Sequence, residues 1–215
     1  MSDALTESEE GTKEPPPGLF DRLRADPVRA PELIALTASE WHAPAADAWA
    51  SKRRRVYGED GKTLGGMAKA RHAQLARLEG AATGWGGFIT LVPDLVGLAW
   101  IQSRLVFYVA AAYGFDPRDP MRPAELLVLT GLYPDPASAR AALDGMGTTM
   151  AAAYVGSRTQ RDEALVARLL KMVGKRGGRR LAGRLIPFFA IAFNAVANER
   201  DTRALADRAI KFYGG

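Results

Sequence analysis

The sequence predicts an all-α fold: a single compact multi-helix domain preceded by a disordered N-terminal tail. Apolar residues recur with the three-to-four-residue spacing of amphipathic helices, and Gly and Pro separate these segments. The alternating apolar and polar pattern of β-strands is almost absent. A chain of 215 residues, 47% of them hydrophobic, is large enough to bury one core.

The predicted tail covers residues 1–27, and the helical domain covers residues 28–215. The tail begins with the polar, acidic stretch MSDALTESEEGTKEPPPG, whose low apolar content predicts disorder. It lacks a basic region followed by an apolar run, so we expect no secretory signal and a cytoplasmic protein. The frequent Ala, Arg and Gly residues are typical of a high-GC bacterial genome.

Two helices are predicted in the first part of the domain. The first runs from Val28 or Pro31 to about Ser39, and the second runs from Pro44 to Arg55. Proline fits the first turn of a helix, where its missing N–H is not needed, so Pro44 predicts a break between the two. The later helices are expected over 65–84, 93–113, 124–133, 135–156, 159–175 and 187–213.

Charge divides the chain into an acidic N-terminal part and a basic body. Residues 1–50 hold 4 Lys and Arg against 10 Asp and Glu, whereas residues 51–215 hold 25 against 14. A basic body favours anionic partners, which include lipid headgroups, nucleic acids and acidic metabolites. A nucleic-acid partner is not favoured, because the sequence has no helix-turn-helix spacing and no RNA-binding motif.

The composition gives no indication of a metal or another cofactor. The chain has no cysteine and two histidines, His42 and His72. The lack of cysteine excludes thiolate metal sites, and two histidines alone do not favour a zinc or non-haem iron site. We therefore expect no metal and no cofactor.

Three polar residues in apolar helices are candidates for a functional site. Asp94 follows Pro93 at a helix start, where a carboxylate complements the helix dipole. Arg104 lies in the middle of the same helix, about 15 Å further along, and needs a partner such as Glu79, Glu125 or Asp144. Asn194 interrupts the apolar run LIPFFAIAFNAVA and either locks two helices together or faces the same pocket.

Membrane contact is the second possibility. The stretch 81–101 has the length of a membrane span, but Pro93, Asp94 and four glycines oppose that interpretation. Basic residues around the apolar run 185–197 instead suggest an interfacial segment. The candidate contacts with an anionic surface are Arg168, Lys171, Lys175, Arg176, Arg179, Arg180 and Arg184.

The stretch 79–120 resembles the central signature of the bacterial EcsC family. The matching residues are Gly80, Gly84, Gly86, Gly87, Pro93-Asp94, Arg104-Leu105-Val106, Tyr113-Gly114 and Asp116-Pro117. The closing part RLIPFFAIAFNAVANERDTRALADRAIKFY is similar to the family's end, although Phe188-Phe189-Ala190 stand where a Gly-rich stretch is usual. The resemblance covers residues 30–213 and implies a helical, membrane-associated protein. It supplies no catalytic residue.

Two functions follow as expectations. The first is a peripheral membrane-associated binding or accessory protein at the inner face of the membrane, with an anionic membrane or a membrane protein as its partner. The alternative is an enzyme acting on a phosphorylated or lipid-linked substrate, with Asp94 as acid or base, Arg104 binding the anionic group and Asn194 orienting it. The oligomeric state is not predicted.

Overall fold

A computed structural model of the chain describes residues 14–82, 91–145, 158–173 and 187–215. These residues form helices and loops, with no strand among them. The elements in chain order are α2 (Leu19–Ala25), the short 3-10 helix η1 (Pro27–Arg29), α3 (Ala30–Tyr57), α4 (Gly61–Ala82), α5 (Leu91–Ala112), α6 (Arg122–Leu129), α7 (Pro136–Asp144), α8 (Arg158–Val173) and α10 (Pro187–Gly214). The predicted all-α class is confirmed.

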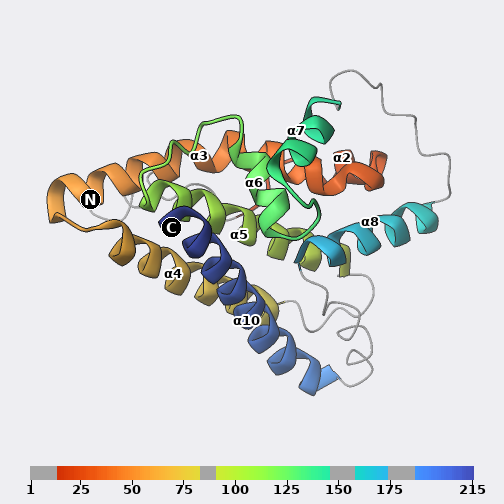
Figure 1. The fold of residues 1–215 in the computed structure, drawn as a ribbon. Coiled ribbons are helices and arrows are strands. Elements are labelled where there is room, and N and C mark those ends of the chain that lie inside the picture. Colours follow the sequence, from red (N-terminus) through yellow and green to blue (C-terminus); the bar gives the residue numbers. More distant parts are fainter. Residues whose placement is uncertain (1–13, 83–90, 146–157, 174–186) are drawn as a thin grey trace.

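Helix α5 is the centre of the domain. It packs against α3, α4, α8 and α10 (Figure 1), and it is the most apolar of these helices. Over Val92–Ala112 its length and composition would allow it to cross a membrane, but the surrounding protein buries Leu95–Ala112. A helix that is apolar on all sides is the expected core of a bundle, since every face meets another helix.

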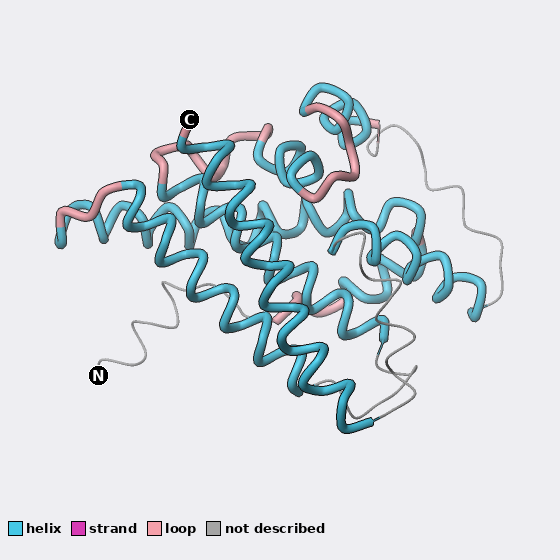
Figure 2. The backbone as a smooth tube through the Cα atoms, turned by 60° about the horizontal axis from the view of Figure 1, so that its bottom comes forward, coloured by secondary structure: helices cyan, strands magenta, loops and turns pink. Residues whose placement is uncertain are grey.

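Helices α4 and α10 lie side by side and run in opposite directions (Figure 2). Lys69 on α4 pairs with Asp207 on α10, and Arg77 Nη1 lies 3.5 Å from Glu199 Oε2. A step of eight residues forward along α4 thus corresponds to a step of eight residues back along α10. At one end of the pair, the ring of Tyr113 lies so close to Gly65 that a Cβ there would approach it to 2.9 Å.

The folded part begins earlier than predicted. Residues 19–25 were assigned to the tail, but they form α2, in which Leu19 and Leu23 are buried in the core. Two leucines four residues apart form one apolar stripe, and α8 and α3 cover it. Arg24 Nε also donates to Asp162 Oδ1 of α8 at 3.2 Å. The prediction for residues 1–13 lies outside the described residues.

The predicted break before Pro44 is also wrong, because α3 continues through it without interruption. Proline inside a helix leaves the carbonyl four residues earlier without its N–H donor. Here Pro44 and Glu40 are both exposed, so water can bind the freed carbonyl. The predicted helix 135–156 is confirmed over Pro136–Asp144, and its part beyond residue 145 lies outside the described residues.

Candidate functional site

Asp94 lies in the first turn of α5, as predicted, beside a second acidic residue. The carboxylate of Glu79 on α4 packs against Gly97, one turn further along α5, so closely that a side chain at Gly97 would collide with it. Burial raises the pKa of Glu79, and the charges of Asp94 and Glu14 raise it further. Asp94 is only partly buried and belongs to a small acidic group at the start of α5.

Arg104 belongs to a different group of residues. Its side chain is 1% exposed, its Nη2 donates to Tyr108 Oη at 3.2 Å, and its guanidinium lies 5.0 Å from the centre of the Tyr108 ring. Ten residues of helix separate it from Asp94, or about 15 Å. Two of the three acids suggested as partners have other bonds, and the first is Glu125, which accepts from Arg122 and Tyr213. Asp144 pairs likewise with Arg140.

Both histidines of the chain lie beside Arg104, and both are 0% exposed. The His42 ring on α3 packs on Trp100 at 4.4 Å between centroids, and the His72 ring on α4 packs on Tyr108 at 5.2 Å. Burial lowers the pKa of His72 to about 3, and the charge of Arg104 contributes to this shift. The pKa of His42 is likewise lowered well below its usual value, first by burial and then by Arg104. Both rings are therefore neutral at neutral pH.

Sequence reasoning considered these histidines only as a metal-ligand count and missed this cluster. The signal was present in the helical spacing. His42 shares a stripe with Ala38 and Ala46, and His72 shares one with Ala68 and Ala76. A histidine inside an alanine stripe faces the same neighbour as the alanines, and all four of these alanines are buried.

Among the described residues Asp94 and Arg104 have different neighbours, and their predicted grouping with Asn194 stays a prediction. Gln102 Nε2 donates to Thr202 Oγ1 at 3.4 Å, and counting back eight residues along each helix from this pair reaches Asp94 and Asn194. Asn194 thus lies on α10 toward the end where Asp94 lies, while its side chain lies outside the described residues.

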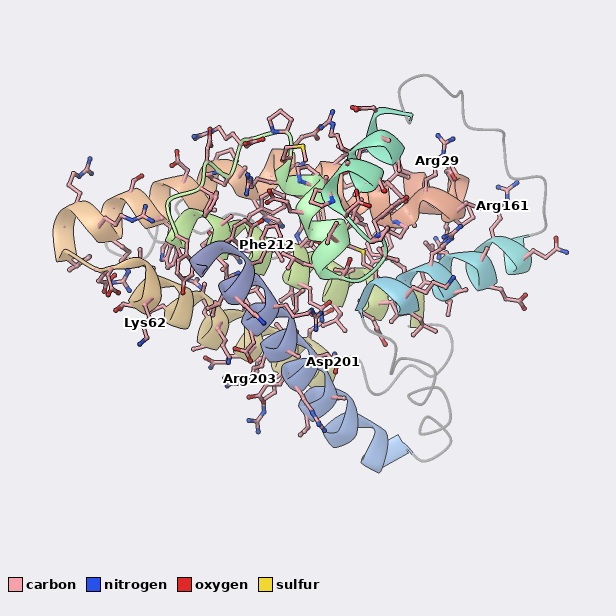
Figure 3. The ribbon with its side chains drawn as sticks, in the orientation of Figure 1. Arg29, Lys62, Arg161, Asp201, Arg203 and Phe212 are labelled. Carbon is pink, nitrogen blue, oxygen red and sulfur yellow. The ribbon has the colours of Figure 1, made fainter. Side chains whose placement is uncertain are left out.

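The predicted basic residues fall in two sets. Arg168 and Lys171 lie on α8, whose apolar face is buried in the core through Leu165, Leu169 and Met172. Arg161, on the same helix, extends away from the bundle (Figure 3). The other predicted contacts, Lys175, Arg176, Arg179, Arg180 and Arg184, lie outside the described residues. Helix α8 can therefore offer its charges to a partner, but its apolar face is already used.

Comparison with known proteins identifies the class of protein that this helical domain represents. The model of the EcsC protein family matches residues 59–214. The chain therefore belongs to the EcsC protein family. No curated protein and no solved structure matches it. The match begins after α3, yet α3 supplies His42 and packs on α5 in the same core.

Proposed function

We propose that this EcsC-family protein is a peripheral membrane protein that docks on the anionic inner face of the membrane through the end of the domain where α10 begins. The observation that carries the proposal is the length of α10. Continuing the register of the Lys69–Asp207 and Arg77–Glu199 pairs to Ala82, the last residue of α4, reaches residue 194 of α10. Residues 187–193, with the apolar sequence PFFAIAF, thus extend past the end of α4 (Figure 1).

The sequence that precedes this projecting end suits an anionic surface. The thirteen residues that precede it, GKRGGRRLAGRLI, contain five Lys and Arg and no acid. Next to it, Leu78 on α4 and Val196 on α10 are each 58% exposed, and the side chain of Arg77 is 62% exposed. Apolar residues flanked by basic ones are the composition that binds the lipid headgroup region.

The other apolar elements of the described chain are less suited to a membrane. Helix α5 is enclosed by its neighbours, and the apolar face of α8 packs in the core. The alternative, an enzyme acting on a phosphorylated or lipid-linked substrate, needs Asp94 and Arg104 around one substrate. Their separation of about 15 Å along α5 favours the binding role.

The test is co-sedimentation with vesicles of neutral phosphatidylcholine and of phosphatidylcholine mixed with phosphatidylglycerol, at low and high salt. We expect binding only to the anionic vesicles, weakened by salt. The Arg179→Ala/Arg180→Ala double variant should bind about 30-fold more weakly, since each basic residue near such a surface contributes about 1 kcal/mol. Arg203→Ala is the control, because Arg203 is exposed on α10 (Figure 3) but lies beyond the projecting end and is paired with Glu199.

Two results would contradict the proposal. Equal binding to neutral and anionic vesicles would show that charge does not drive the interaction. No binding by folded protein would show that the lipid surface is not the partner. In the second case a membrane protein becomes the better candidate partner, and recovery of the protein with the membrane fraction of cells would distinguish it.

A further inference from the structure

Four buried nitrogen atoms beside Arg104 have no hydrogen-bond partner among the described residues. They are Nδ1 and Nε2 of His42, Nε2 of His72 and Nε1 of Trp100. All three side chains are at most 1% exposed. Buried polar groups in folded proteins nearly always have a partner, which can be protein, water or a bound ion. Several orphaned nitrogens in one cluster are therefore the setting in which water or a small ion is bound.

We propose that His42, His72, Trp100 and Arg104 enclose a small inorganic anion, such as chloride, phosphate or sulfate. The side chains come from three helices, because α3 and α4 each pack on α5 and bring one histidine to it. His42 packs on Trp100, and the Arg104 guanidinium and the His72 ring both lie against Tyr108. Burial of the whole cluster limits the ligand to a few atoms and excludes a lipid headgroup.

The hydrogen-bonding chemistry of the cluster is dominated by donors. The indole N–H of Trp100 and the guanidinium of Arg104 can only donate, and a neutral His42 ring donates through one of its nitrogens. His72 Nδ1 lies 2.8 Å from the Ala68 carbonyl, which can only accept, so the proton of a neutral His72 is on Nδ1. Its Nε2 is then an acceptor, which becomes a donor when the ring takes up a second proton.

The charges decide between an anion and a metal ion. The groups that act on His42 are Arg104 and His72, and those that act on His72 are Arg104 and Arg71, all cationic or able to become so. The positive charge of Arg104, which adds to burial in keeping protons off both rings, also repels a metal cation. The described residues moreover contain no group of three or more His, Cys, Asp or Glu that could hold a metal. An anion reverses this balance, because it is attracted by Arg104 and favours protonation of a histidine.

Equilibrium urea unfolding at constant ionic strength tests the proposal, since unfolding opens the buried site to the ligand. Sodium phosphate, sulfate or chloride replaces sodium gluconate, whose anion is too large to be enclosed. We expect stability to rise with phosphate, sulfate or chloride: above the Kd, each tenfold rise in ligand multiplies the folded-to-unfolded ratio about tenfold. The stabilisation by the anion should be larger at pH 6 than at pH 7.5, because anion binding is coupled to proton uptake by a histidine of the cluster.

Trp100→Phe and Trp41→Phe form the matched pair of variants. Trp100→Phe removes one donor and keeps an aromatic ring, so the gain from the anion should fall, whereas Trp41 is 42% exposed and its variant should behave as wild type. Equal gains in both variants, as general salt effects produce, would overturn the proposal. If Trp100→Phe does not fold, the measurements on the wild type test the proposal. It fails if gluconate stabilises the protein as well as all three inorganic anions do. It also fails if zinc chloride stabilises the protein more than sodium chloride does.

Discussion

Acidification should destabilise this protein through its two buried histidines before most of its carboxylates titrate. His42 and His72 are the only histidines in the chain, and both are buried beside Arg104. An unfolded histidine takes up its proton near pH 6.5, whereas burial and Arg104 hold the pKa of His72 at about 3 in the folded state. Below pH 6.5 the unfolded state therefore binds more protons, and stability falls as the pH falls toward 3.

The magnitude follows from the difference between the two pKa values. At pH 5 the medium lies about 1.5 pH units below the pKa of the unfolded histidine, so His72 alone costs about 2 kcal/mol. His42 adds a cost of the same sign, because its pKa is also lowered. Burial raises the pKa of Glu79 and Glu125, so these two carboxyls act in the opposite direction. A loss of 2 kcal/mol is a large part of the stability of an ordinary domain.

Urea unfolding at pH 7.5 and pH 5 in gluconate buffer measures this loss. His72→Gln isolates the contribution of one ring, since its stability should fall by about 2 kcal/mol less than that of the wild type over the same interval. Comparing the two proteins cancels the contributions of the carboxyls. If wild type and variant lose the same free energy between the two pH values, His72 is not buried and neutral in the folded protein.

Two further predictions test the packing by urea unfolding. Gly65→Ala should destabilise the protein, because its Cβ would lie 2.9 Å from the Tyr113 ring, whereas Gly66→Ala, with nothing within 4 Å, should stabilise α4 by up to about 1 kcal/mol; equal effects would refute the close contact. Leu23→Ala should lower the free energy of unfolding by about 2–5 kcal/mol, since Leu23 is fully buried. A change near zero would mean that α2 does not pack in the core.

The sequence was a good guide to the helices and to the start of α5. Apolar spacing and the Pro and Gly boundaries depend on neighbouring residues, so they can be read from the chain. The prediction at Pro44 was wrong because the cost of a proline inside a helix falls where water can reach the freed carbonyl, and that depends on which face of α3 is exposed. The assignment of residues 19–25 to the tail was wrong for a related reason. A two-turn helix is stable only against a partner, which for α2 is provided by α8 and α3.

The candidate site shows the same division. Asp94 at the start of a helix and Arg104 inside an apolar one were visible in the sequence, but their neighbours were not. Glu79, His42 and His72 are distant in the chain and reach α5 only through the packing of α3 and α4. Composition and periodicity alone thus determined an all-α domain with a basic body. Tertiary structure decided which charges are buried and what lies beside them, because burial and electrostatic interactions act between residues that only folding brings together.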